Sequence, residues 1–157
     1  MSEAVYIETS ILGYLTARPS RDLVVAANIE ITREWWDTRR NTFQLYVSQA
    51  VVKETSQGDA QIASQRLEII RDLELLDLNQ SVLDLAEQFL ERSSLPAKAD
   101  VDAVHIAAAT IHSMDYLLTW NCKHIANAQI QRKLAEISLD CGYELPILCT
   151  PYELLGD

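Results

Sequence analysis

The sequence predicts an α/β fold with a mainly parallel sheet of about five strands and helices on both of its faces. Short apolar runs typical of buried strands recur along the chain, and stretches with helical spacing of apolar residues separate them. This alternation favours a parallel sheet, because parallel strands need a long crossover connection that is usually a helix. Neither an internal repeat nor a shift in composition divides the chain, so we expect one domain over residues 1–157.

The first elements follow from local patterns. Segment 4–7 is short, apolar and β-prone, and the helix after it is expected to take Ser10 as its N-cap. A second helical pattern covers 21–40, where apolar residues recur one turn apart. Segment 43–47 alternates between apolar and polar residues and predicts the second strand, after which Ser48 is expected to cap a helix.

The remaining elements continue the same alternation. A turn at Gly58-Asp59 leads into a further helix. The expected elements after it are, in order, strand 75–78, helix 81–92, helix 98–113, strand 116–119, helix 125–139 and strand 145–149. Pro146 indicates the start of the last strand or an edge position, because proline cannot donate to a central ladder.

Composition narrows the possible functions. The 157 residues include 48% hydrophobic and 23% charged residues, which is ordinary for a protein with its own core. The formal net charge is -10, the opposite of a protein that coats nucleic acid, although carboxylates that hold a cation could still bring that cation to a phosphate. Three widely spaced cysteines, no signal-like N-terminus and no apolar run of about 20 residues predict a reduced, cytoplasmic protein without a membrane segment.

Four polar residues stand where ligands bind in such sheets, beyond the carboxyl ends of the strands. Glu8 follows the first strand, Glu54 lies in the helix after the second strand, and Asn121 follows the fourth. Asp102 lies in the first turns of the helix that leads to the fourth strand. Each alone has an ordinary interpretation as a solvated or capping residue. Together they are hard oxygen ligands suited to Mg²⁺ or Mn²⁺, which would support phosphodiester cleavage.

The same residues carry a resemblance to a known family. Segment 6–12 resembles the opening of PIN domains, and Glu54 resembles their second acidic position. Segment 102–109, Asp-Ala-Val-His-Ile-Ala-Ala-Ala, is similar to the most specific motif of the family, and 117–121 resembles the segment with a hydroxyl residue and the last acidic position. The matching segments occur in the order of the family and span most of the chain.

The resemblance implies a metal-dependent endoribonuclease similar to VapC-type toxins of toxin–antitoxin pairs. It also implies an RNA substrate, a cognate antitoxin protein, a homodimer, and Mg²⁺ or Mn²⁺ as the cofactor. By residue-wise transfer, the implied metal ligands are Glu8, Glu54 and Asp102. Asn121 would take the fourth acidic position of the catalytic set. The hydroxyl residues implied to support this set are Thr9, Ser10 and Thr119.

Two departures from the family pattern keep alternatives open. Glu8 stands where Asp is usual, and Asn121 stands where an acid is usual, so we expect one strong metal site rather than two. They also motivate a second hypothesis, a weak or inactive PIN-like module that acts by binding a protein. A phosphotransfer receiver is a third, but Asn79 and Thr150 occupy the places where it needs an acid after strand three and a lysine after strand five.

Other side chains have no assigned role from the sequence. His105 lies one turn after Asp102, and its position is equally compatible with the site and with the core. Cys122 and His124 could form a nucleophile pair, but no other residue supports one. Some basic residues could contact RNA phosphates, although a solvated charge is the better explanation for each of them: Lys98, Lys123, His124, Arg39 and Arg40.

Overall fold

A five-stranded sheet forms the centre of the molecule in the computed structural model, which describes residues 2–156. The strands are β1 (Ala4–Ile7), β2 (Gln44–Ser48), β3 (Glu74–Leu76), β4 (Tyr116–Leu118) and β5 (Ile147–Cys149). Their order is β3-β2-β1-β4-β5, and every pairing is parallel. The predicted five strands are confirmed. The chain builds outward from β1 to β3 and then crosses to β4 on the other side of β1, which makes the β1–β4 pair the switch point of the topology.

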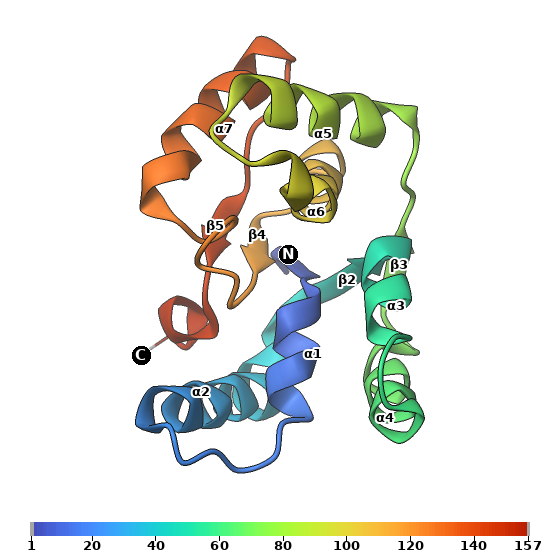
Figure 1. Cartoon of the computed structure of the whole chain (residues 1–157), viewed down its shortest axis with the longest axis vertical. Helices are drawn as coiled ribbons and strands as arrows, with labels where there is room; N and C mark the ends of the chain where they lie inside the picture. The colour runs from blue at the N-terminus through green and yellow to red at the C-terminus, as the bar shows by residue number, and fades with distance from the viewer. Residues whose placement is uncertain (1, 157) are drawn as a thin grey trace.

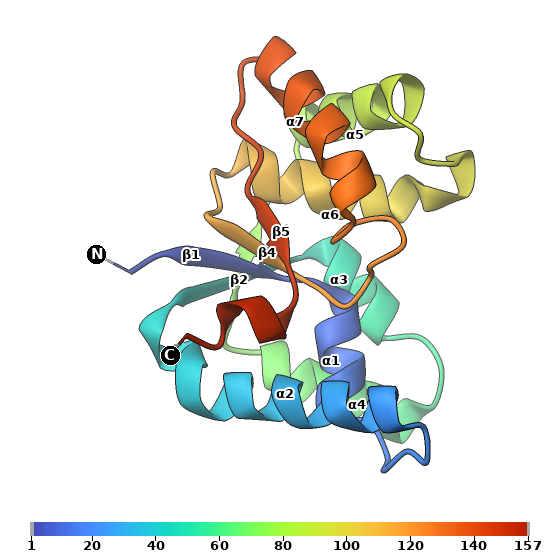
Figure 2. The same ribbon diagram turned by 90° about the vertical axis from the view of Figure 1, so that its left-hand side faces the viewer.

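Helices cover both faces of the sheet, as the sequence predicts (Figure 1). They are α1 (Thr9–Leu15), α2 (Leu23–Arg39), α3 (Gln49–Thr55), α4 (Ala60–Ile70), α5 (Gln80–Arg92), α6 (Asp100–Ile111) and α7 (Ala128–Asp140), with 3-10 turns η1 (Arg40–Thr42), η2 (Ala97–Ala99) and η3 (Pro151–Leu154). Figure 2 shows α5, α6 and α7 on one side of the sheet and α1, α2 and α4 on the other. None of the described helices combines the length and the apolar content that crossing a membrane would require.

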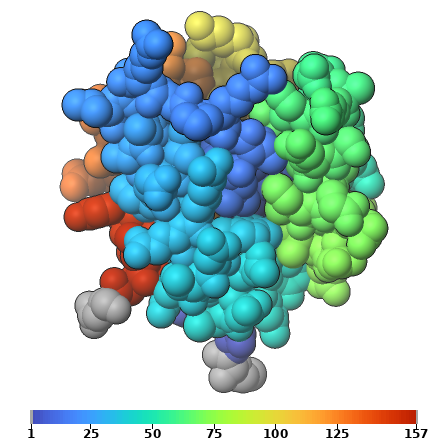
Figure 3. Space-filling model, turned by 90° about the horizontal axis from the view of Figure 1, so that it is seen from below, coloured from blue at the N-terminus to red at the C-terminus, as the bar shows by residue number. Residues whose placement is uncertain are grey.

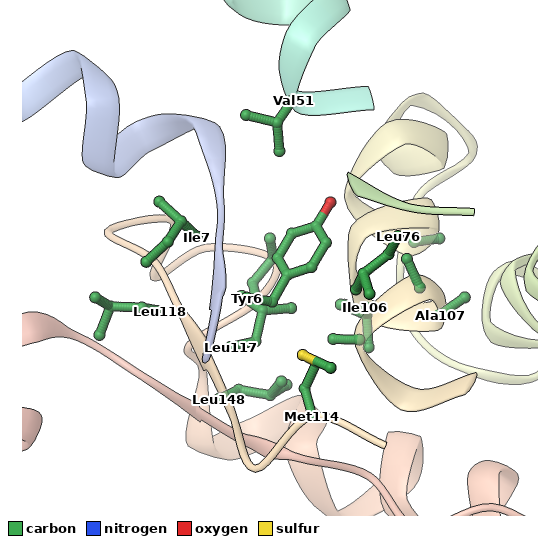
Figure 4. Packing of buried hydrophobic residues seen from close by; sticks show 14 of the residues in the cluster. Tyr6, Ile7, Val51, Leu76, Ile106, Ala107, Met114, Leu117, Leu118 and Leu148 are labelled. Atoms are coloured by element: carbon green, nitrogen blue, oxygen red, sulfur yellow. The ribbon is translucent and has the colours of Figure 1, made fainter. Parts of the chain in front are cut away.

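The core is built around β1. Val5, Tyr6 and Ile7 are fully buried because both faces of a parallel sheet are covered. Successive side chains of a strand alternate between its faces, so Tyr6 and Ile7 point to opposite faces, and both lie in apolar surroundings (Figure 4). The register places Leu117 beside Tyr6 and Leu118 beside Ile7. On the α2 side, Trp35 is fully buried and its indole N–H donates to the carbonyl of Leu154 at 3.1 Å, so Trp35 packs in the core of its own chain.

The first helix begins earlier than the sequence predicts, and the predicted Ser10 cap is wrong. Glu8 is the N-cap of α1: its backbone is extended, and its side chain accepts the N–H of Ser10. The glutamate side chain is long enough to reach the backbone N–H two residues further along the chain. Only Glu8 therefore separates the end of β1 from the start of α1. Ser48 does cap α3 as predicted, accepting the N–H of Ala50.

Smaller differences occur near the last strands. Helix α7 begins at Ala128 instead of residue 125, because the carbonyl of Asn121 accepts the N–H groups of Ile125 and Ala126 and holds them in a turn. Asn127 then caps α7 by accepting the N–H of Gln129. Strand β5 is shorter than predicted and starts directly after Pro146 at the sheet edge, in agreement with the position expected for that proline.

Candidate metal centre

The carboxylate of Glu8 lies at the carboxyl ends of the two central strands. Because Ile7 pairs with Leu118 in the register, the next residues, Glu8 and Thr119, emerge side by side. The N–H of Glu8 donates to the carbonyl of Leu118 at 3.1 Å. One carboxylate oxygen, Oε1, accepts hydrogen bonds from the Thr119 hydroxyl at 2.6 Å, the Ser10 N–H at 3.1 Å and the Ser10 hydroxyl. Glu8 is only 5% exposed, so these donors stabilise a charge that is almost removed from water.

Glu54 reaches the same place from α3. Its Oε1 accepts the Thr9 hydroxyl at 2.6 Å and lies 2.6 Å from Nε2 of His105. Burial by itself would raise the pKa of Glu54, but the combined interactions with His105 and Thr9 outweigh burial and hold the pKa below its usual value. Glu54 is therefore a carboxylate at neutral pH, as a metal ligand must be.

A buried hydrogen-bonded chain lies behind Glu54. Nδ1 of the fully buried His105 lies 2.7 Å from the Tyr6 hydroxyl, which lies 2.7 Å from the Ser48 hydroxyl. Figure 4 shows the hydroxyl end of Tyr6 directed toward α3. Burial raises the pKa of Tyr6 far above its usual value, so the phenol keeps its proton. A neutral His105 that donates from Nε2 to Glu54 satisfies this chain, because Tyr6 then donates to Nδ1 and Ser48 donates to Tyr6.

Asp102 and Asn121 both form hydrogen bonds with His124. Oδ2 of Asp102 lies 3.0 Å from Nδ1 of His124, and the amide oxygen of Asn121 accepts the His124 N–H at 3.0 Å. The N–H of Asn121 in turn donates to the Thr119 hydroxyl at 2.9 Å, and the same hydroxyl donates to Glu8. Asn121 thus shapes the loop after β4, and the loop positions His124 against Asp102.

The structure brings some of the expected residues closer together than others. Ligand atoms of Glu8, Glu54 and His105 all lie within 4.8 Å of one another. Asp102 is outside this group, one helical turn before His105 on α6, and Asn121 directs its amide oxygen into its own loop. The role of His124 beside Asp102 was missed from the sequence. The spacing of three residues between Asn121 and His124, typical of a capping turn, was the one available signal.

The three carboxylates share an arrangement that suits a cation. Within residues 2–156, the hydrogen bonds to the carboxylates of Glu8 and Glu54 all involve Oε1. The hydrogen bond to the Asp102 carboxylate involves Oδ2. The other oxygen of each carboxylate accepts no hydrogen bond from this part of the chain. One oxygen is thus held in place while the other is left for a ligand, as expected where outer partners orient metal ligands. The donor set fits Mg²⁺ or Mn²⁺, which prefer carboxylate oxygens.

Comparison with known proteins gives the fold a name. No protein-family model and no curated protein matches the chain. Among solved structures, it is similar to the Mycobacterium tuberculosis toxin VapC20, with a TM-score of 0.61 and 13% identity over 76% of this chain and 92% of that chain. The chain has a VapC-like PIN-domain fold. A chain of the Rickettsia felis VapBC2 complex, bound to a DNA fragment from its promoter, is similar over 94% of this chain and 98% of that chain, with a TM-score of 0.56 and 16% identity.

The details of this VapC-like fold weaken the other chemical hypotheses. Burial and the charge of Glu153 raise the pKa of the Cys122 thiol, and Nδ1 of His124 is engaged by Asp102, so a Cys122–His124 nucleophile pair has no support. A receiver is disfavoured as well. Asn79 caps α5 by accepting the N–H of Val82, and Thr150 caps η3 through a capping box.

Proposed function

We propose that the protein is a Mg²⁺- or Mn²⁺-dependent endoribonuclease and the cytoplasmic toxin of a toxin–antitoxin pair, with residues 1–157 acting as one PIN domain. The observation that supports this proposal is that Glu8 and Glu54 bring ligand atoms within 4.8 Å of each other and that these two residues and Asp102 each have one anchored and one open oxygen. The likeness to VapC20, described as a toxin that cleaves the sarcin-ricin loop, supports RNA as the substrate class.

In this proposal Glu8, Glu54 and Asp102 hold the ion through their open oxygens. When bound, the ion offsets the negative charge of the phosphate and lowers the pKa of the attacking water. The hydroxyls of Thr9, Ser10 and Thr119 keep the carboxylates in place by donating to them. The amide of Asn121 completes the catalytic set at its edge, where it orders the loop and adds no charge.

A cleavage assay with matched variants tests the proposal. Purified protein is incubated with RNA and Mg²⁺ or Mn²⁺, with and without excess chelator. We expect Glu54→Gln and Asp102→Asn to lose at least about 100-fold in cleavage rate, since each removes a charged ligand oxygen while keeping the side-chain size. The control Glu87→Gln changes the same charge at an exposed position of α5 and should cleave like wild type. Cleavage that survives both the chelator and Asp102→Asn would refute the metal-dependent mechanism.

The binding-module hypothesis retains one specific observation in its favour. The amide oxygen of Asn121 accepts the N–H of His124, so the fourth position of the site supplies neither a charge nor a free oxygen. If wild-type protein folds normally and binds RNA or a partner protein without cleaving RNA in Mg²⁺ or Mn²⁺, this hypothesis replaces the nuclease.

The antitoxin partner is expected in an apolar groove beside Glu54. Two acidic residues, Glu54 and Asp100, and one basic residue, Lys53, border this groove, and this net negative border suits an amphipathic helix that carries a basic residue. Leu83 and Val101 are 47% and 40% exposed there. The apolar residues that line the groove are Ala50, Leu78, Leu83, Val101 and Val104.

Co-expression with the neighbouring gene tests the partner. We expect the neighbouring gene product to co-purify with wild type and to inhibit cleavage, and Leu83→Glu with Val101→Glu to lose both effects. The exposed Leu139→Glu on α7 is the matched control. Identical size and activity with and without the neighbour would refute an antitoxin. Light scattering on the isolated protein tests the homodimer that belongs to this proposal.

A further inference from the structure

Arginines gather around the segment that joins α1 to α2. The guanidinium of Arg33, on α2, donates to the carbonyl of Ala17 at 3.0 Å, and Nε of Arg66, on α4, donates to the Thr16 hydroxyl at 3.0 Å. Arg18 follows directly and is exposed. Two helices and one loop thus bring Arg18, Arg33 and Arg66 to the far end of α1, and we call these residues the arginine patch.

The charges of the arginine patch are not neutralised within residues 2–156. No patch arginine forms an ion pair with a carboxylate there, and the bonds of Arg33 and Arg66 go to neutral oxygens. The carboxylates of Asp22 and Asp59 accept backbone N–H groups as the N-caps of α2 and α4 and form no ion pair with a patch arginine within residues 2–156. In a chain with a net charge of -10, three uncompensated arginines at one place form an unusual positive surface.

Helix α1 connects this surface to the carboxylates. At its first residue the Thr9 hydroxyl donates to Glu54, and just past its end the Thr16 hydroxyl accepts from Arg66. Seven residues at 1.5 Å each separate the two ends by about 10 Å. Thr9, Gly13 and Thr16 share one face of the helix by their spacing of four and three.

The middle of that face is open. A Cβ atom placed on Gly13 would meet no heavy atom within 4 Å, although Leu12 before it is fully buried and Tyr14 after it is partly buried. Figure 3 shows α1 recessed between α2 and α4, with the 16–22 segment crossing at its end. The open position at Gly13 therefore lies between the acidic site at one end of this helix face and the arginine patch at the other.

We propose that single-stranded RNA lies along this face of α1, with its scissile phosphate at the carboxylates and a phosphate farther along the chain bound by the arginine patch. This inference rests on the proposed function and adds the path of the substrate. Guanidinium groups bind phosphate oxygens through paired N–H donors, and the acidic site alone would repel the RNA. Gly13 keeps the path clear where a larger side chain would block it.

The test separates binding from cleavage. RNA binding is measured in an Asp102→Asn background over a range of salt concentrations, and steady-state cleavage is measured in the otherwise wild-type protein. Arg18→Gln is the main variant, because Arg18 makes no side-chain hydrogen bond within residues 2–156 that its loss could break. Arg33→Gln is the second variant. Arg132→Gln, an exposed arginine on α7, removes the same charge from another surface and is the control.

We expect each patch variant to weaken RNA binding roughly threefold to tenfold and to reduce the slope of log affinity against log salt by about 0.7. The KM for a long RNA should rise by a similar factor with kcat nearly unchanged, while a dinucleotide substrate, too short to reach the patch, should show no effect. Gly13→Leu should raise the KM for long RNA and keep or raise Tm, because leucine favours the helix and its Cβ meets no neighbour.

The outcomes distinguish the path from the function. If wild type cleaves RNA and the patch variants have the same RNA affinity and KM as Arg132→Gln, the RNA path is overturned and the nuclease proposal stands. A wild type that binds RNA with the expected salt dependence but does not cleave it overturns the nuclease and retains the path. Unchanged RNA binding together with loss of a co-purified partner protein assigns the arginine patch to that protein and overturns the path. A wild type that neither binds nor cleaves RNA overturns both proposals.

Discussion

His105 uses both ring nitrogens in the buried part of the site. Nε2 faces Glu54 and Nδ1 faces Tyr6, so this one side chain links a candidate ligand on α3 to the central strand β1. An imidazole has a donor and an acceptor a fixed distance apart, which suits a bridge between a carboxylate and a phenol. Its contribution is to hold Glu54 in one orientation, which determines where the open oxygen points.

Replacing His105 by Ala should lower the free energy of unfolding by about 2–4 kcal/mol, because the change leaves a cavity and two polar groups with one fewer partner each. Urea denaturation measures this loss. His112→Ala is the control, since His112 bonds only to the carbonyl of Asp77 in an exposed position, and it should cost less than about 1 kcal/mol. A loss equal to that of the control would show that the Tyr6–His105–Glu54 chain contributes little to stability.

We expect Asn121 to limit the proposed site to one strongly bound ion. Wild type should bind one Mn²⁺ strongly in calorimetry, because its fourth position is a neutral amide whose oxygen is already occupied by a backbone N–H. Asn121→Asp adds a charge and should strengthen a second binding event. Two strong sites in the wild type would contradict this expectation. Asn127→Asp, the cap of α7, changes the same group outside the site and serves as the control.

The strands position the site because they end together. Strands β1 and β4 run in parallel and in register, so a residue just after each one arrives at the same edge, and helices α1 and α3 begin there. The last strand, β5, completes this edge: the N–H of Thr119 donates to the carbonyl of Cys149 at 2.9 Å. The burial of β5 against the core should therefore affect the stability of the site.

The Cys149 thiol in β5 should make the free energy of unfolding depend on pH. Burial, with the charge of Glu153, raises the pKa of Cys149 from 9.0 to about 12. Folding favours the neutral thiol, so this stabilisation is complete below pH 9 and is lost as the pH rises toward 12, by at most about 1.4 kcal/mol per pH unit. In urea denaturation, wild type should lose more stability from pH 8 to pH 10 than Cys149→Ala does. Cys141→Ala, at an exposed cysteine, should follow the wild type.

The molecule as a whole is acidic, and two of its carboxylates, Glu8 and Glu54, come together at the candidate site. Two of the candidate ligands, Glu8 and Glu54, have ligand atoms within 4.8 Å of each other, so they repel when no ion is present. The net charge of -10 adds to this repulsion, while the arginine patch gives a phosphate chain one attractive approach. Metal binding should therefore stabilise the fold in addition to supporting chemistry.

Adding Mn²⁺ at about 100 times its dissociation constant should raise the free energy of unfolding by about 2.7 kcal/mol, because the ion binds the folded state alone. Differential scanning calorimetry with and without metal measures the corresponding rise in Tm. Glu54→Gln should abolish most of the rise, whereas Glu87→Gln should retain it. An equal rise in both variants would place the ion elsewhere.

Much of the architecture could be predicted from the sequence, and the errors concern mainly where helices begin. The five strands and the Ser48 cap follow from local patterns, and so does the position of β5 after Pro146. Helix starts were less accurate: Glu8 replaced Ser10 as a cap because a longer side chain folded back, and α7 began late because Asn121 formed a turn. Such choices depend on competition between neighbouring caps that have similar free energies.

The sequence alone determined that acidic residues follow parallel strands and that these residues resemble a PIN-domain set, because strand ends and helix starts are encoded locally. Only the tertiary structure decided which oxygens are held and which are open. Partners such as Thr119 for Glu8 and His105 for Glu54 are separated by 111 and 51 positions in the chain. Side chains so far apart meet through register and helix packing, which no local pattern specifies.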